Sequence, residues 1–201
     1  WLHHPALADQ PVADRVSERV LDAALGERDA TVWLGRAREV DTPPADAGSL
    51  AGLQAAVAAL AAEFAPELGR SAWARMTGRM INGEVRAAAM VPLHHLVAPQ
   101  LDDHVSFTVP VGDIGADGFP SESGERSLQA LAEAMTARLG ASGCYVGDET
   151  TPGRRVLHFY VDSTTTAKDY LRGVAEKWPQ GKVTSKLMPD PLWTAVAHLR
   201  S

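Results

Sequence analysis

The stretch Arg154–Ser163 reads RRVLHFYVDS and has the clearest strand pattern in the chain. Successive side chains of a strand point to opposite faces, so this pattern produces one apolar face and one half-polar face. The apolar face carries Leu157, Phe159 and Val161. The half-polar face carries Val156, His158 and Tyr160. We therefore predict a central strand around which the C-terminal half of the chain is arranged.

Hydrophobic periodicity and turn residues predict the other elements of this half. In order they are a strand at His104–Val111, a helix that ends at Gly140, strands at residues 143–147 and 155–163, a helix that ends at Pro179, and a strand at 182–188. Trp193–Leu199 is predicted either to complete that last strand or to form a second one. The β-α-β-β-α-β order indicates a ferredoxin-like α+β domain, in which helices cover one face of an antiparallel sheet.

The N-terminal half has a similar order of patterns. The predicted elements are a helix from Pro11 to Gly26, a strand at Ala30–Val40, a helix at Leu50–Phe64, and a hairpin of residues 71–81 and 84–93 turned by Asn82-Gly83. Because strand, helix and hairpin occur twice, we interpret the chain as a degenerate internal duplication. The predicted divisions are an N-terminal arm at 1–10, a degenerate α+β domain at 11–97 and the ferredoxin-like domain at 104–201.

Composition narrows the class of function. The chain has 201 residues, 45% of them hydrophobic, and a net charge of −6, which disfavours binding to nucleic acid or to an anionic membrane. No apolar run approaches the about 20 residues that a membrane span needs. The single cysteine excludes an internal disulfide and fits a cytoplasmic protein. Frequent alanine and arginine are typical of a GC-rich bacterial genome.

Four features of the C-terminal half resemble one known family. They are Asp117-Gly118-Phe119-Pro120 before a leucine-rich helix, the strand Val156–Asp162, the helix ending in Trp178, and Asp190-Pro191-Leu192-Trp193. Residues from about 104 to 197 resemble the bacterial domain of unknown function 695 family. The resemblance implies a ferredoxin-like fold similar in shape to the bacterial regulators of ribonuclease activity, which are small acidic proteins that bind an enzyme and have no catalytic centre.

The half-polar face of the central strand is the first candidate binding surface. His158 and Tyr160 share it with Ser106 and Thr108 of the neighbouring strand, at the place where RNA-recognition folds of this topology stack bases. The face has one aromatic residue and the chain lacks the RNA-binding sequence motifs. The alternative is that this face packs against the first domain or a second subunit, with the Tyr160 hydroxyl hydrogen-bonded.

The sequence contains only weak patterns for a metal site or a reactive cysteine. The loop that begins at Asp113 partly resembles a calcium-binding loop, but Gly115 and Gly124 occupy two ligand positions, so we expect a solvated turn with Ser123 as a helix cap. The pairs His3-His4 and His94-His95 point to opposite sides of an extended chain and form no ready chelate. Cys144 has no local base, which favours a packing role over a catalytic one. We expect no cofactor and no metal.

Two further clusters have both a functional and a structural interpretation. Trp178 and Trp193, the latter in the Asp190–Trp193 turn, are either anchors of an interface or core residues. Arg154, Arg155, Lys182 and Lys186 either converge as an anion site at one end of the sheet or include solvated edge lysines that discourage strand pairing.

The chain contains no H-E-x-x-H, G-x-S-x-G or phosphate-binding loop motif. The leading hypothesis is therefore a non-enzymatic cytoplasmic protein that binds another macromolecule, namely another protein or a second copy of itself. The first alternative is an enzyme or small-molecule binder with its site between the domains near His158, Tyr160 and Ser106. The second alternative is an RNA-binding module.

Overall fold

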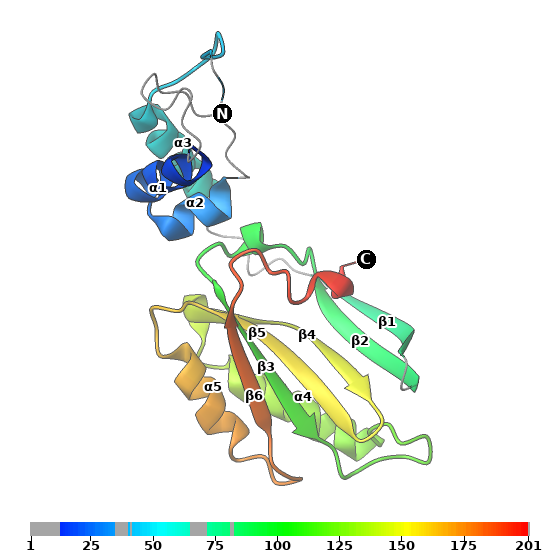
Figure 1. Cartoon of the computed structure of the whole chain (residues 1–201). Coiled ribbons are helices and arrows are strands. Elements are labelled where there is room, and N and C mark those ends of the chain that lie inside the picture. The colour runs from blue at the N-terminus through cyan, green and yellow to red at the C-terminus, as the bar shows by residue number, and fades with distance from the viewer. Residues whose placement is uncertain (1–12, 35–39, 41, 65–71, 81–82, 201) are drawn as a thin grey trace. The chain divides into compact units, whose positions relative to one another are not determined.

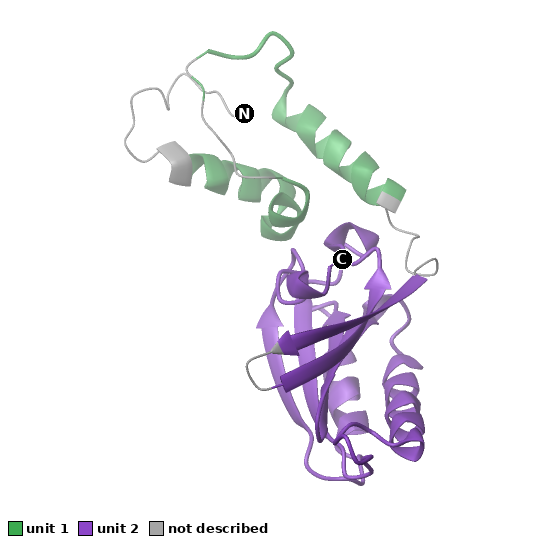
Figure 2. Ribbon diagram, turned by 90° about the vertical axis from the view of Figure 1, so that its right-hand side faces the viewer, with its two compact units in different colours: residues 1–65 green, residues 66–201 purple. Residues whose placement is uncertain are grey.

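A computed structural model of the chain describes residues 13–34, 40, 42–64, 72–80 and 83–200. It contains two compact units, residues 1–65 and residues 66–201 (Figure 2). The predicted N-terminal arm and the Asn82 turn position lie outside the described residues. Among the described residues, no helix has the length and apolar character needed to cross a membrane.

The first unit contains the helices α1 (Ala13–Leu25), α2 (Glu27–Trp33) and α3 (Leu50–Phe64). The first and third confirm predicted helices. The strand predicted at Ala30–Val40 is wrong over residues 30–33, which are helical. Glu27 and Asp29 lie in the first turn of α2, where carboxylates interact favourably with the helix dipole, and Val32 is buried. The alternating pattern around Trp33 therefore predicted a strand in a segment that is helical.

The second unit is built on one six-stranded sheet in the order β1-β2-β4-β5-β3-β6, with every neighbouring pair antiparallel (Figure 1). Its strands are β1 (Ala72–Met80), β2 (Gly83–Val91), β3 (Asp103–Pro110), β4 (Gly143–Thr151), β5 (Arg154–Val161) and β6 (Thr184–Pro189). The helices α4 (Glu122–Thr136) and α5 (Ala167–Ala175) connect β3 to β4 and β5 to β6. The predicted ferredoxin-like α+β arrangement is confirmed.

The hairpin β1–β2 extends this sheet beyond the ferredoxin-like strands. β2 pairs with β4 from Ala89↔Gly147 to Arg86↔Thr150. A Cβ atom on Gly147 would lie 2.7 Å from the Ala88 carbonyl oxygen, so the close approach of the strands requires glycine here. The sequence placed this hairpin in a domain ending at residue 97, whereas the two units divide after residue 65. The described part of the first half thus runs through three helices and a hairpin, without the predicted first strand.

The main core lies between the sheet and the helices α4 and α5, which cover the same face (Figure 1). The predicted apolar face of β5 points into it: Leu157, Phe159 and Val161 are at most 1% exposed. A second apolar cluster lies on the opposite face, where residues 93–101 and the segment 193–199 cover the sheet near Tyr160. That last segment is a turn followed by the short 3₁₀ helix η5 (Ala197–Leu199), and β6 ends at Pro189. The prediction that Trp193–Leu199 completes the last strand or forms a second one is therefore wrong in both alternatives.

Candidate functional site

The strand register confirms that the predicted site residues of β3 and β5 share one face of the sheet. Other parts of the chain cover this face. Ser106 pairs with His158 and His104 pairs with Tyr160, so these side chains lie on one side of the sheet. Tyr160 has no exposed surface, and His158 is 6% exposed. Ser106 and Thr108 are half-buried. Tyr160 therefore has no free ring face for an RNA base.

The C-terminal segment forms the cover over Tyr160. The Trp193 ring stacks on the Tyr160 ring with centroids 4.3 Å apart, and the Trp193 indole N–H donates to the Leu101 carbonyl at 2.9 Å. Trp193 is fully buried, and Trp178 is buried in the main core with its indole N–H donating to the Pro110 carbonyl. Both tryptophans are therefore core residues in the folded chain.

Asp190 fastens this cover to the sheet. Its carboxylate accepts hydrogen bonds from the Tyr160 hydroxyl at 2.5 Å, from the hydroxyl and N–H of Thr194, and from the Ala195 N–H. Burial of Asp190 opposes its ionisation, but these hydrogen bonds prevail and lower its pKa. Asp190 thus has a structural role that accounts for its place in the sequence motif.

A chain of hydrogen bonds that the sequence did not predict crosses the same face. His104 Nε2 lies 3.1 Å from His158 Nδ1, and His158 Nε2 lies 3.1 Å from Glu149 Oε1. His198 contacts the same Glu149 oxygen at 2.9 Å. Hydrogen bonds from the two histidines hold the pKa of Glu149 at about 2, and burial together with His158 lowers the pKa of His104 to about 4.

These contacts hold the sheet face and the C-terminal segment together. Among the described residues, no group of three or more histidine, cysteine or carboxylate side chains has a geometry that could hold a metal ion. Cys144 lies at the edge of the same apolar cluster, and burial raises its pKa to about 12, which disfavours the nucleophilic thiolate. The alternation of β3 already placed His104 beside Ser106, but Glu149 and His198 had no sequence signal.

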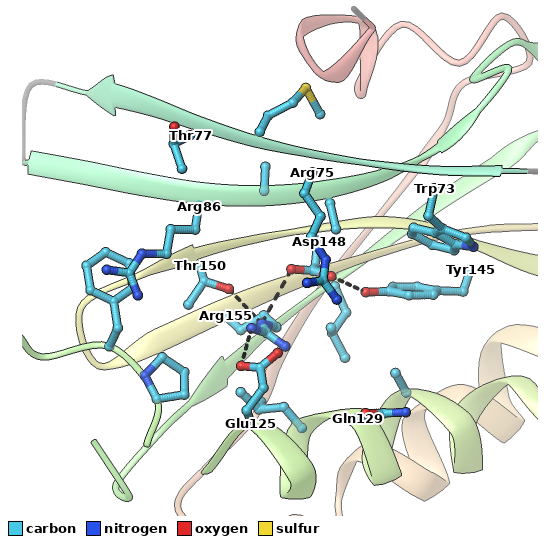
Figure 3. A pocket seen from close by; sticks show the side chains of 18 of the residues that line it. Trp73, Arg75, Thr77, Arg86, Glu125, Gln129, Tyr145, Asp148, Thr150 and Arg155 are labelled. Atoms are coloured by element: carbon cyan, nitrogen blue, oxygen red, sulfur yellow. Dashed lines mark hydrogen bonds and ion pairs between the residues drawn. The ribbon is translucent and has the colours of Figure 1, made fainter. Parts of the chain in front are cut away.

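A groove lies on the opposite face of the sheet, between the hairpin β1–β2 and α4. Its volume is about 800 Å³. Figure 3 shows the side chains that line it. β1 and β2 form one wall, β4 and β5 the floor, and the exposed side of α4 the other wall. Ala88 and Ala132 line it, and their small side chains leave the space open. Of the predicted site residues, Arg155 lines this groove.

Arg155 projects from the floor of the groove toward α4. Its guanidinium donates to Glu125 at 2.7 Å and to the Thr150 hydroxyl at 2.6 Å, and it lies 3.4 Å from an Asp148 oxygen. These carboxylates pair with Arg155, and the register places Lys186 beside Ser106 on the other face of the sheet, which favours the alternative of solvated edge lysines over an anion site. Both lysines are exposed, on or just before the edge strand β6. Arg154 is exposed and donates to Thr151.

Aromatic side chains occupy one end of the groove. Trp73 is 49% exposed and stacks on Tyr145 with ring centroids 5.2 Å apart. The Tyr145 hydroxyl donates to Asp148 at 2.5 Å, and burial raises the pKa values of both groups. Hydrogen-bonded polar groups thus lie beside an exposed indole, a combination suited to binding an organic side chain.

The other end of the groove is closed by the loop that precedes α4. The Arg86 guanidinium lies 3.7 Å from the centre of the Phe119 ring and pairs with Glu84 and Asp117. The cap of α4 is Ser121, whose hydroxyl accepts from the Gly124 N–H, so the expectation of Ser123 is wrong. The carboxylate of Asp113 is held by the same Ser121 hydroxyl at 2.6 Å.

The groove was not predicted from the sequence, because the residues that line it come from segments far apart in the chain. Trp73 and Arg75 belong to β1, Tyr145 and Asp148 to β4, and Glu125 to α4. The signals in the sequence were a tryptophan at position 73 of a predicted strand and an aspartate at position 148, next to the strand predicted at residues 143–147. Neither signal locates a groove until β2 is known to pair with β4.

Comparison with known proteins identifies a family for this fold. The model of a family of unknown function, DUF695, matches residues 87–197, more than half of the 201-residue chain. The match includes α4 and the floor of the groove, whereas Trp73 and Arg75 precede it. Searches of curated proteins and of solved structures gave no significant match. The chain therefore belongs to the family of unknown function DUF695.

Proposed function

We propose that this protein acts by binding a partner protein, and that the groove between β1–β2 and α4 receives an extended segment of that partner. The observation that carries the proposal is the groove itself, an open volume of about 800 Å³ that the side chains of the described residues leave unfilled. A groove of this volume lies within the size range of ligand-binding clefts, and the exposed tryptophan beside it provides an aromatic contact surface.

The dimensions of the groove favour an extended peptide. The lining residues of β1 run from Trp73 to Thr77, four strand steps that span about 13 Å. The lining residues of α4 run from Glu122 to Ala132, ten helical steps that span about 15 Å. Both walls therefore match four or five residues of extended chain.

The character of the lining fits an interface. Trp73 offers an exposed indole of the kind that dominates binding energy at protein interfaces. Polar groups with fixed positions, Tyr145 and Asp148, lie beside it and supply hydrogen-bonding specificity. The floor is held rigid by Arg155, because its hydrogen bonds join β5 to β4 and α4.

Sequence properties support the same class of function. The net charge of −6 disfavours nucleic acid, and the chain has no motif of a catalytic nucleophile. The similarity in shape to the bacterial regulators of ribonuclease activity is part of this proposal, since those proteins work by binding an enzyme. We place the protein in the bacterial cytoplasm on its composition and its single cysteine.

The two alternative functions were assigned to a surface whose key side chains are covered. A small-molecule or enzyme site near His158 and Tyr160 requires access to side chains that are at most 6% exposed. The RNA-binding alternative required Tyr160 as a stacking platform, and Trp193 occupies its ring face. Both hypotheses would need another surface.

A peptide-display experiment tests the proposal. The immobilised full chain is used to select phage from a library of random seven-residue peptides, alongside an Ala132→Phe variant and an Ala130→Phe control. Ala132 lines the groove, whereas Ala130 is an exposed residue of the same helix outside the lining. We expect enrichment on the wild type and on Ala130→Phe, and its loss on Ala132→Phe.

Two results would overturn the proposal. One is the absence of any enriched peptide on the wild type. The other is a set of enriched peptides that binds Ala132→Phe as well as it binds the wild type. Near-ultraviolet circular dichroism of each variant shows whether the tertiary packing is intact.

A further inference from the structure

We infer that the segment bound in the groove carries an acidic side chain that pairs with Arg75. Two positions away along the same segment, a large apolar or aromatic side chain lies on Trp73. The inference rests on the proposed function and adds the chemistry of the ligand. Arg75 extends from β1 into the groove toward Asp148, beside Trp73 and Tyr145 (Figure 3).

Arg75 is the arginine of the groove whose charge is not used by a partner. Arg155 pairs with Glu125 and Asp148, and Arg86 pairs with carboxylates at its own end of the groove. Among the residues that the structure describes, Arg75 has neither an ion pair nor a side-chain hydrogen bond, and it is exposed. A carboxylate entering the groove would therefore find a guanidinium with all its donors free.

The neighbouring acidic groups do not cancel this attraction. Both Glu125 and Asp148 accept hydrogen bonds or ion pairs from Arg155, and Asp148 also accepts from Tyr145. The negative charge of Asp148 is therefore matched by the cation of Arg155, which lies 3.4 Å away. The guanidinium of Arg75 thus remains the strongest unmatched electrostatic feature on that wall.

The spacing along β1 sets the spacing in the ligand. Trp73 and Arg75 are two residues apart on one strand, so their side chains point to the same side about 6.6 Å apart. Side chains two positions apart in an extended peptide have the same separation and direction. An aromatic or large apolar residue and an acidic residue at positions i and i+2, in either order, therefore match the wall.

The chain offers a matched control for Arg75. Arg79 lies on the same face of β1, is exposed, and likewise has no ion pair among the described residues, but it is not part of the groove lining. Arg75→Glu and Arg79→Glu change the net charge equally. A difference between them therefore reports on the groove and not on the overall charge.

The test repeats the random seven-residue peptide selection on the full chain, on Arg75→Glu and on Arg79→Glu. We expect aspartate or glutamate to be enriched two positions from a large apolar residue on the wild type and on Arg79→Glu. On Arg75→Glu, lysine or arginine should replace the acidic residue. One synthetic peptide from the wild-type selection should bind Arg75→Glu about tenfold more weakly, and added salt should weaken its binding to the wild type.

The outcomes separate this inference from the proposed function. Peptides that require an open groove, and so fail on Ala132→Phe, but show no acidic preference overturn the inference and leave the proposed function standing. An acidic preference that survives in Arg75→Glu also overturns the inference. Absence of any enriched peptide on the wild type overturns both. If Arg75→Glu is not correctly folded by circular dichroism, Arg75→Gln replaces it, with loss of the acidic preference as the expected result.

Discussion

Acidification should destabilise this fold through His104, and the structure gives the size of the effect. Glu149 is ionised and accepts the Nε2–H of His158, so His158 Nδ1 accepts from His104 Nε2–H. That tautomer leaves His104 Nδ1 without a partner, and it is the unpaired buried side-chain atom among the described residues. Protonation of Nδ1 would bury an N–H with no acceptor, which costs free energy.

The pKa values set the pH window. The pKa of His104 is lowered from 6.5 to about 4 in the folded state, so the unfolded chain takes up the proton first as the pH falls. Stability is therefore complete above about pH 6.5 and decreases toward about pH 4. Between about pH 8 and about pH 5, His104 should remove about 2 kcal/mol from the free energy of unfolding. The charged or titratable groups around His104 are His158, Asp190, Lys186 and His198.

Urea unfolding at about pH 8 and about pH 5, followed by tryptophan fluorescence, measures the loss. The matched variant is His104→Gln, whose amide N–H can donate to His158 Nδ1 as the imidazole does but does not titrate. The wild type should lose about 2 kcal/mol more than the variant between the two pH values. Equal losses in the two proteins would refute the assignment of the depressed pKa to His104.

Three further predictions concern stability in urea. Tyr160→Phe should cost about 1 to 2 kcal/mol, because the hydroxyl donates to a buried carboxylate; no change would mean that the C-terminal cover is not held by this bond. Gly147→Ala should destabilise the sheet, because the added methyl group would push β2 away from β4. Gly173→Ala lies in a helix with open space around it and should stabilise the protein by about 0.5 to 1 kcal/mol. The reverse order of stabilities would contradict the β2–β4 pairing. Arg155→Met should cost about 3 kcal/mol by leaving Asp148 buried without its cation, and a near-neutral result would show that this pair is not needed.

The sequence alone specified most of the ferredoxin-like unit. The alternation in Arg154–Ser163 gave the correct facing of Leu157 and Phe159, because a strand buried against helices needs one continuous apolar face. Helical stripes, with Gly140 and Pro179 as the predicted stops, located α4 and α5 for the same local reason. The secondary structure of residues 30–33 was predicted wrongly, because so short an alternating pattern fits a helical turn as well as a strand.

Only the tertiary structure decided which strands pair and which faces are covered. Nothing local to β2 specifies that Arg86 faces Thr150, because pairing across more than sixty residues depends on the packing of the whole sheet. The closing of the Tyr160 face by Trp193 and the opening of the groove beside Trp73 both follow from that assembly. Side-chain periodicity is encoded within a few residues, whereas a groove and a hydrogen-bonded histidine chain exist only where distant segments meet.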